Sequence, residues 1–532
     1  MKKITNPILK GFNPDPSMIR VGEDYYIANS TFEWFPGVRI HHSTDLQNWE
    51  LLNYALTRKE QLDMLGNPDS CGVWAPCLSY YAGTYYLVYS NVRSFDGGWK
   101  DTPNFLVTCT DIKAGNWSDP IYLNSMGFDA SLFHDDDGRK WLLSLIVDHR
   151  KGKFFGGIVL QEYDEESQKL VGPITNIFQG SELGITEGPH IYKRKGYYYL
   201  MTAEGGTEYD HAVSLARSRN IEGPYEIHPL NPVITAKHAP SNTLQKAGHA
   251  SLVETPNGES FCAFLVSRPL TERGRCPLGR ETALAQVEWK EDDWLYTISG
   301  RKEPDDVFEI SGLASPELDK TLTFDNFDSP ILNLEYNALR RPISEDWCSL
   351  TDRPGYLRLY GGESLSSFHH QSLLARRVED FKFEVRTKVE FDSESFQQMA
   401  GLVLYYNTQH YHYLHISYHE DAPGKMLQVI TCDKGKNIEP LLSPLHIEEG
   451  KPLYLEAIVD SDKAQFSFSY DGQEWVKVGA ELDFSILSDD YVCDDMGRYR
   501  AAFTGAFVGV CCQDFRGTRK PADFHFFEYK PL

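Results

Sequence analysis

Short runs of apolar, β-branched and aromatic residues, separated by turn residues, recur along the chain as far as Gly300. Tyrosine pairs mark the second strand of several of these units, as in Tyr25-Tyr26 and Tyr85-Tyr86. Long amphipathic helical periodicity is absent. Each unit therefore predicts a four-stranded antiparallel sheet. In the first unit the predicted strands are at 17–20, 25–30, 38–43 and 49–52.

A short sequence motif occurs five times, and each copy precedes a predicted innermost strand. The successive register positions are separated by 60, 54, 58 and 62 residues. Repetition on this scale, with only strand and turn signals in each unit, is typical of radial architectures. The sequence therefore predicts an all-β chain that begins with a five-bladed β-propeller. The residues in register are Asp15, Ala75, Asp129, Glu187 and His249.

The topology of such a blade predicts which residues meet. Antiparallel strands alternate in direction, so the start of an innermost strand and the loop between the second and third strands lie on one face of the propeller. The register residues, three of which are acids, should therefore share a mouth with these loops. Other side chains expected at this mouth are those of Phe32, Trp34, Thr207 and Arg280.

The pattern changes in the second part of the chain, and 532 residues are too many for one compact core. We expect the propeller over 1–302 and a charged, proline-containing linker over 303–320. From 321 to 532 the strands are longer and alternate more regularly, as at 381–385 and 411–416. This pattern predicts a β-sandwich of the jelly-roll, concanavalin-like kind.

Composition and charge limit the class of function. A formal net charge of −24 argues against binding to a phosphate backbone or an anionic membrane, because both need clustered Lys and Arg. Lys2 and Lys3 are not followed by the apolar core of a signal peptide. Ten cysteines at irregular spacing indicate reduced thiols. We expect a cytoplasmic protein without nucleic-acid or membrane partners.

The three register acids carry the candidate chemistry. Carboxylates that converge on a propeller axis repel one another, and such sites shift carboxyl pKa values apart. Glycoside hydrolysis needs one ionised carboxylate and one protonated acid. Asp15 is held between two prolines, Glu187 is one methylene longer and can reach a leaving-group oxygen, and Asp129 can adjust the protonation of the acid. Taken alone, either Asp would more often cap a turn, and only the shared register favours catalysis.

Aromatic and polar side chains at the same mouth fit a sugar ligand. Aromatic rings stack on pyranose faces, although core packing is the alternative, above all for Trp34. A hydrogen-bonded core histidine is the alternative for His249. The aromatic candidates are Phe32, Trp34, Trp74 and Phe128. The other candidates for substrate binding are Ala75, Thr207, His249 and Arg280.

Four motifs in this order resemble glycoside hydrolase family 43, and as a set they are specific. The resemblance spans the chain, because the second part is similar to the sandwich of that family's β-xylosidases. It implies inversion, with Asp15 as general base, Glu187 as general acid and Asp129 as pKa modulator. It also implies release of xylose from the non-reducing ends of β-1,4-xylooligosaccharides, with side activity on arabinofuranosides. The motifs are NPDPS at 13–17, VWAP at 73–76, GFDAS at 127–131 and TEGPH at 186–190.

The resemblance also assigns residues around the acids. Arg280 matches an arginine near the sugar hydroxyls, and His249 matches a histidine that binds calcium in some members. No cofactor is otherwise implied. In the β-xylosidases the sandwich contributes a phenylalanine that closes the pocket, for which Phe503 is the candidate and Phe507 the second choice. A homo-oligomer, dimer or tetramer, is expected from the exposed sandwich.

Three other functions remain open at this point. An arabinofuranosidase or arabinan-cleaving enzyme of the same family would carry the same three acids. A retaining propeller enzyme that acts on fructosides would carry Arg-Asp-Pro and Glu-Cys pairs, which are missing here. A non-catalytic carbohydrate-binding propeller has no need of three acids on its axis.

Overall fold

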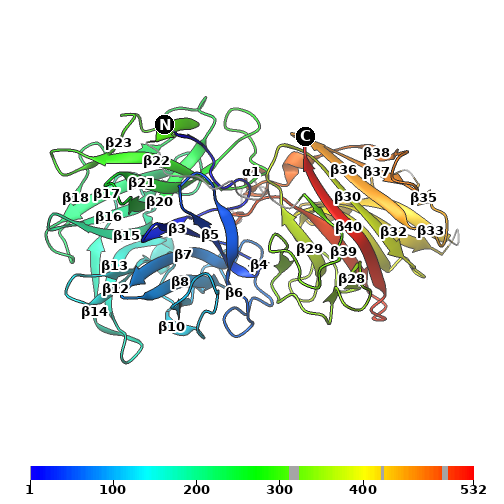
Figure 1. The fold of residues 1–532 in the computed structure, drawn as a ribbon, viewed down its shortest axis with the longest axis horizontal. Coiled ribbons are helices and arrows are strands. Elements are labelled where there is room, and N and C mark those ends of the chain that lie inside the picture. Colours follow the sequence, from blue (N-terminus) through cyan, green and yellow to red (C-terminus); the bar gives the residue numbers. More distant parts are fainter. Residues whose placement is uncertain (1, 311–322, 421–423, 442, 494–500) are drawn as a thin grey trace. The chain divides into compact units, whose positions relative to one another are not determined.

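The structure is a computed structural model that describes residues 2–310, 323–420, 424–441, 443–493 and 501–532. The chain divides into two compact units, Met1–Gly274 with Arg280–Leu318, and Arg275–Gly279 with Asp319–Leu532 (Figure 1). Within the described residues, no helix is long and apolar enough to cross a membrane. In the described part of the chain, the ten cysteines lie outside disulfide bonds.

The first unit is the predicted five-bladed propeller, counted over residues 2–310. The strands of blade one are β2 (Ser17–Val21), β3 (Asp24–Asn29), β5 (Gly37–Ser43) and β6 (Glu50–Leu56). Those of blade two are β7 (Gly72–Tyr81), β8 (Thr84–Val92), β9 (Asn104–Cys109) and β10 (Ile121–Asn124). Those of blade three are β11 (Ser131–His134), β12 (Lys140–Val147), β13 (Phe155–Asp164) and β14 (Lys169–Phe178), with a 3-10 turn at Arg150–Gly152.

The remaining two blades follow the same antiparallel order. The strands of blade four are β15 (Glu187–Arg194), β16 (Tyr197–Glu204), β17 (Ala212–Ser218), β18 (Glu226–Ile227) and β19 (Ile234–Thr235). Those of blade five are β20 (Gln245–Glu254), β21 (Ser260–Ser267), β22 (Glu281–Trp289) and β23 (Leu295–Thr297). A two-residue strand, β4 (Trp34–Phe35), lies in the loop between β3 and β5.

The innermost strands form a closed ring, with contacts in the order β2, β7, β11, β15, β20 and back to β2. Serines two positions after a register residue link neighbouring blades. Ser17 Oγ accepts from the backbone N of Leu78 (2.9 Å), and Ser131 Oγ donates to Pro189 O (2.5 Å). Ser251 Oγ donates to Pro16 O (2.8 Å) and thereby closes the ring. In blades one, three and five the repeated motif therefore ties the segment after the register residue to the next blade.

The hydrophobic core of the propeller lies between adjacent blades. One cluster joins blades one and two through residues such as Ala28 and Leu87, and another joins blades four and five through Met201 and Phe264. A third joins blade five to blade one, with Met18 packed in the same cluster as Phe261.

The N-terminal strand β1 (Lys2–Thr5) pairs with β24 (Val307–Ile310). The side chain of Asn6 strengthens this junction, because its Nδ2 donates to Leu284 O (2.8 Å) and its Oδ1 accepts from Leu284 N (2.9 Å). Residues 307–310 of the predicted linker, 303–320, therefore form a paired strand of the first unit, while 311–322 lie outside the described residues. A four-residue strand signal, VFEI, is too short to be separated from a linker by pattern alone.

The second unit confirms the predicted sandwich. Its two sheets run in the orders β27-β28-β40-β30-β36-β37-β38 and β29-β39-β31-β32-β33-β34, and one hydrophobic cluster contains inward-facing residues of both, such as Val385 and Leu402. The strands of the first sheet are β27 (Cys348–Ser349), β28 (Leu357–Tyr360), β40 (Pro521–Pro531), β30 (Lys382–Phe391), β36 (Leu453–Asp460), β37 (Lys463–Ser469) and β38 (Val476–Asp483). Those of the second are β29 (Ser372–Arg377), β39 (Phe507–Asp514), β31 (Gln398–Asn407), β32 (His410–His419), β33 (Gly424–Asp433) and β34 (Lys436–Ile438). The shorter elements are β25 (Phe324–Asp325), β26 (Ala338–Leu339), β35 (Leu445–His446), a 3-10 turn at Phe484–Ile486 and α1 (Asp489–Cys493).

Candidate active site

The register acids lie where the sequence predicts them. Asp15 and Asp129 each precede an innermost strand, β2 and β11, by two residues, and Glu187 is the first residue of β15. All three are buried, with exposed fractions of 5%, 8% and 9%. Three buried carboxyls that approach one axis from three blades form the centre of the candidate site.

The backbone at the register positions is strained. Asp15, Asp129 and His249 have φ values of 51°, 54° and 51°, in the left-handed region that residues other than glycine seldom adopt. In blade four the left-handed residue is Gly188, with φ 56°, one position after the acid. Strain of this kind persists where the surrounding structure enforces it, and it concentrates at functional sites.

Asp15 is surrounded by groups that favour its ionised form. Ser30 Oγ donates to Oδ2 (2.7 Å), and Arg280 donates to Oδ1 (3.3 Å). His249 Nδ1 lies 3.3 Å from the same oxygen. Burial by itself would raise the pKa of Asp15, but Arg280, His249 and Ser30 outweigh it and hold that pKa well below its usual range. Asp15 is therefore a carboxylate at any pH near neutrality.

Glu187 and Asp129 have the opposite tendency. Burial, followed by the negative charge of Asp129, raises the pKa of Glu187 to about 8. Burial is also the main cause that raises the pKa of Asp129 to about 6, and it is reinforced by the charge of Asp15. The backbone N–H of Gly188 donates to Asp129 Oδ2 (3.1 Å), which ties the two residues together. Near neutrality the site thus holds one protonated acid, Glu187, and one firmly ionised carboxylate, Asp15.

Comparisons with known proteins identify the family of the chain. Residues 4–295 match the model of glycosyl hydrolases family 43, and residues 324–530 match that of the beta xylosidase C-terminal concanavalin A-like domain. The chain belongs to glycoside hydrolase family 43. It is 50% identical to a beta-xylosidase of Bacillus subtilis, with 99% of each chain covered. It is 47% identical to xylosidase/arabinosidase 43B of Humicola insolens, with 100% of this chain and 98% of the relative covered.

Solved structures support the same assignment of this family 43 chain. A crystal structure of xylan beta-1,4-xylosidase from Bacillus halodurans has a TM-score of 0.95 and 53% identity, and the match covers 99% of this chain and 100% of that one. The Bacillus licheniformis family 43 protein BlXynB has a TM-score of 0.90 at 35% identity, with both chains fully covered. The predicted family and the predicted combination of propeller and concanavalin-like sandwich are therefore confirmed.

A buried polar framework holds Asp15, the predicted base of this family 43 site. Asn29 Nδ2 donates to the carbonyl oxygens of Asn13 (3.1 Å) and Pro14 (2.9 Å), which flank Asp15 on its N-terminal side. Thr282 Oγ1 donates to Asn13 O (2.6 Å). Glu281, next to Arg280, accepts two hydrogen bonds from Arg268 (2.6 and 2.8 Å). The loop that carries the base and the strand that carries its arginine are thus fixed independently of any ligand.

His249 completes the ring between Asp15 and the acid. Burial would lower its pKa, but the adjacent Asp15, together with the charges of Asp129 and Glu187, raises it. A Cβ at Gly188 would lie 2.7 Å from His249 Nε2, so only glycine allows the acid loop to approach the imidazole this closely. His249 therefore acts as a hydrogen-bond partner of the base.

Three of the four aromatic candidates pack against one another near the acids. The rings of Phe32 and Trp74 lie 5.9 Å apart and those of Trp74 and Phe128 5.1 Å apart. The guanidinium of Arg280 lies over the Phe32 ring, 5.3 Å from its centroid. These rings therefore stand beside the acids, as predicted. Trp34 is fully buried, but the exposed fractions of Phe32, Phe128 and Trp74 are also only 2%, 3% and 5%, so burial alone does not separate sugar stacking from core packing.

The other predicted substrate contacts occupy the expected segments. Ala75 is buried within β7, next to an irregularity in its pairing with β8. Thr207 is half-buried in the loop that follows β16. Phe503 is a buried residue of the second unit, and its entry into the pocket stays a prediction. Contact of any of these residues with a sugar is likewise a prediction.

Sequence reasoning missed three residues near the acids. Ser30 directly follows β3, next to the loop that the sequence places at the mouth. Its position in the chain is therefore the signal that identifies it. Glu204 is fully buried and accepts from Ser181 N (2.8 Å), Thr186 Oγ1 (2.7 Å) and Ser214 Oγ (2.6 Å), which holds the segment just before Glu187. Ile185 has φ 47° although it is β-branched, and no sequence signal marks that strain.

Neighbouring side chains of the described residues do not offer His249 a direct calcium site, and calcium held there through water stays a prediction. Ca²⁺ takes six to eight oxygen ligands. Across the described residues, no group of three or more His, Cys, Asp or Glu side chains is placed to hold a metal ion. The histidine nitrogen that faces an acid is 3.3 Å from Asp15 Oδ1, the spacing of a hydrogen bond.

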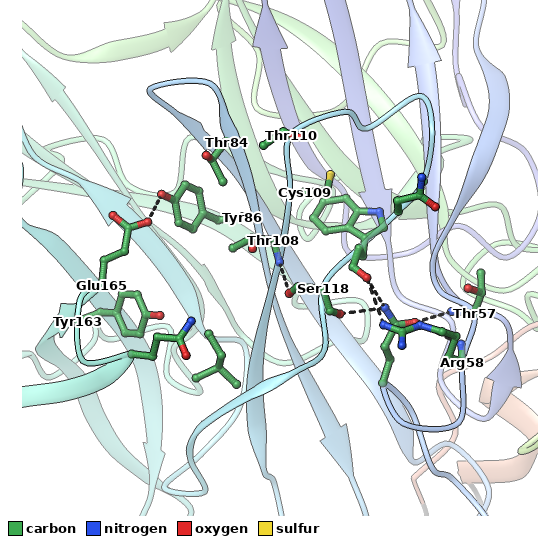
Figure 2. Close-up of a pocket in the computed structure, with 16 residues that line it drawn as sticks. Thr57, Arg58, Thr84, Tyr86, Thr108, Cys109, Thr110, Ser118, Tyr163 and Glu165 are labelled. Carbon is green, nitrogen blue, oxygen red and sulfur yellow. Dashed lines mark hydrogen bonds between the residues drawn. The ribbon is translucent and has the colours of Figure 1, made fainter.

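A separate cavity of about 680 Å³ lies elsewhere on the propeller (Figure 2). Its polar groups are engaged with one another: Tyr86 donates to Glu165 (2.5 Å), and Arg58 donates to Trp117 O (3.2 Å). None of the predicted site residues lines it. This cavity is therefore distinct from the candidate active site.

Proposed function

We propose that this chain is an inverting, exo-acting β-xylosidase that releases xylose from the non-reducing ends of β-1,4-xylooligosaccharides. The observation that carries the proposal is the separation of the carboxyl pKa values, with Asp15 far below its usual range and Glu187 at about 8. This is the charge state that hydrolysis with inversion requires. Support for xylose comes from relatives named as beta-xylosidases in Bacillus subtilis and, at 46% identity, in Escherichia coli.

The reaction then proceeds in one displacement. Asp15 accepts a proton from a water molecule as the water oxygen attacks the anomeric carbon on the face opposite the leaving group. Glu187 gives its proton to the glycosidic oxygen as the bond between that oxygen and the anomeric carbon breaks. The products are xylose of inverted configuration and a shortened chain with a new hydroxyl group. Return of a proton from Asp15 to Glu187 through solvent restores the enzyme.

Asp129 acts through Glu187. Its negative charge is the second cause, after burial, of the raised pKa of Glu187. Because it also accepts a hydrogen bond from Gly188 N (3.1 Å), it positions the backbone next to the acid. Arg280 and Ser30 have the corresponding role at the base, since both donate to Asp15.

Arabinofuranoside cleavage is the second candidate activity. It is favoured by the 47% identity to a Humicola insolens relative whose name joins xylosidase and arabinosidase. The three acids serve both reactions, because a xylopyranoside and an arabinofuranoside present an anomeric carbon and a leaving oxygen in similar relation. The preference is decided by contacts to the sugar ring.

The experiment compares nitrophenyl β-xyloside, nitrophenyl α-arabinofuranoside and xylobiose, with the product anomer followed by NMR. We expect xylobiose to give α-xylose first. The variant Glu187→Gln should lose about 10²- to 10⁴-fold in kcat on xylobiose, and less on the nitrophenyl substrate, whose leaving group needs little protonation. Glu182→Gln, an exposed neighbour in the loop before Glu187, is the matched control and should keep full activity. A β-xylose product would contradict the mechanism.

Location and assembly also remain our predictions. A cytoplasmic location is checked by cell fractionation. A homo-oligomer, dimer or tetramer, is checked by light scattering on the purified chain.

A further inference from the structure

Trp99 is an exposed tryptophan for which the reaction so far has no use. Its exposed fraction of 67% is the highest of the large hydrophobic side chains in the described part of the first unit; Leu230 and Tyr122 follow with 59% and 58%. Tryptophan has a large apolar surface, so its exposure at one site suggests that a ligand covers it there.

The loop that presents Trp99 is hydrogen-bonded. It extends the hairpin of β8 and β9, because Arg93 N donates to Asp101 O (2.8 Å) and Asp101 N donates to Ser94 O (3.0 Å). Lys100 Nζ also donates to Gly97 O (2.8 Å) across the tip. The indole is therefore held on a defined turn.

This loop lies on the face of the propeller that carries the acids. It joins the second and third strands of blade two, and such loops share a face with the starts of the innermost strands. At its base, the ring of Phe95 lies 4.7 Å from that of Trp74 and 6.1 Å from that of Phe128, which directly precedes Asp129. The loop that carries Trp99 is thus anchored, through Phe95 four residues earlier, against Trp74 and Phe128 of the candidate site.

A second loop of the same face supplies a polar neighbour. His149 lies between β12 and β13 of blade three, and its ring centroid is 4.3 Å from that of Trp99 with an interplanar angle of 53°. Asp148 fixes this turn, because its backbone N donates to Phe154 O (2.9 Å) and its carboxylate accepts from Arg150 (2.8 Å). An apolar ring face beside an imidazole offers both stacking and hydrogen bonding to a sugar.

We propose that Trp99 and His149 form an outer subsite that holds a xylose residue of the leaving group, beyond the bond that is cut. In an exo-acting enzyme the released sugar occupies the buried pocket, so the rest of the chain passes outward through the mouth. Xylopyranose has no hydroxymethyl group, so its ring is flat enough to stack on an exposed indole. This inference rests on the proposed function and adds to it the preference for longer substrates.

The test measures kcat/KM on nitrophenyl β-xyloside, xylobiose and xylotetraose for the wild type and Trp99→Ala. We expect a loss of about tenfold on xylotetraose, the size of one stacking contact, and a change of less than about twofold on nitrophenyl β-xyloside. Trp99→Phe should recover part of the loss, and His149→Ala should lose about threefold on xylotetraose alone. Tyr122→Ala removes a similarly exposed aromatic residue from the outermost strand of the same blade and should change nothing.

A binding readout separates contact from folding. Xylotetraose added to the inactive Glu187→Gln variant should quench tryptophan fluorescence, and the quench should be smaller when Trp99→Ala is added. An equal loss of kcat/KM on all substrates, or no loss on xylotetraose, would overturn the outer subsite while leaving the xylosidase assignment intact. A wild type that cleaves arabinofuranosides and no xyloside would overturn both.

Discussion

Replacing Asp129 with Asn removes one negative charge beside Glu187 and leaves the shape of the side chain nearly unchanged. The Asn Oδ1 can still accept the hydrogen bond that Gly188 N gives to Asp129 Oδ2 (3.1 Å). The substitution therefore tests the charge of Asp129 separately from its position. Because that charge helps to raise the pKa of Glu187, its loss should make the general acid ionise at lower pH.

The size of the shift follows from the order of the causes. Burial is the largest cause of the raised pKa of Glu187, which is about 8 against an ordinary 4.5, and Asp129 is the second. Removing Asp129 should therefore lower that pKa by about one to two units and leave it above its ordinary value. The alkaline limb of kcat/KM should move down by the same amount, so that at pH 8 the variant loses a further factor of about 5 to 50 on top of any loss at its optimum.

The assay is a pH profile of kcat/KM on xylobiose for the wild type and Asp129→Asn. Asp136→Asn is the control, because the Asp136 side chain is 82% exposed and lies in a turn of the same blade, at the other end of β11. Its alkaline limb should stay in place. An alkaline limb that stays in place or rises in Asp129→Asn would refute the electrostatic role.

Three further predictions concern the same groups. Arg280→Gln removes a charge that lowers the pKa of Asp15, so the acidic limb of kcat/KM should rise toward the ordinary range of an aspartate; an unchanged limb would contradict the role of Arg280. Glu187→Gln should raise the melting temperature at pH 8 and have little effect near pH 4.5. The folded wild type retains a proton on Glu187 that the unfolded chain releases between these values, so its stability falls as the pH rises through this window; a constant difference in Tm would refute this. Dialysis against a chelator should leave kcat/KM unchanged, whereas a loss that calcium alone restores would establish a calcium site at His249.

Much of the propeller could be predicted because its signals are local and repeated. The turn residues and tyrosine pairs recur in each blade, so errors in one unit are corrected by the others. The predicted linker, 303–320, shows the limit of prediction from local signals. Its residues 311–320 lie outside the described part of the chain, but residues 303–310 are described. Residues 307–310 form a strand only because β1 is available as a partner some three hundred positions earlier, and a pairing at that distance leaves no local pattern.

The candidate site also has a part that the sequence predicts and a part that it does not. The three acids share a register, so the sequence identifies them together. Their protonation depends on contacts between blades: Arg280 lies 265 positions from Asp15 and His249 lies 234 positions from it, and neither distance in space can be read from spacing. The serine at 30 and the buried Glu204 are ordinary strand-end residues in the sequence. Their importance follows from what lies opposite them after folding.

Equivalent positions in the five blades acquire different chemistry through the backbone as well as the side chain. Asp15 and Asp129 sit in the left-handed conformation themselves, whereas in blade four this conformation falls on Gly188, one residue later. Glu187 therefore enters the site from a different backbone geometry, and the N–H of Gly188 becomes available to Asp129. The same glycine admits the ring of His249, which a Cβ would meet at 2.7 Å. In blade four the left-handed residue is thus one position later than in blades one and three. Through Gly188, the segment that carries Glu187 contacts Asp129 on one side and His249 on the other. The separation of the carboxyl pKa values therefore depends on this glycine as well as on the three carboxyls.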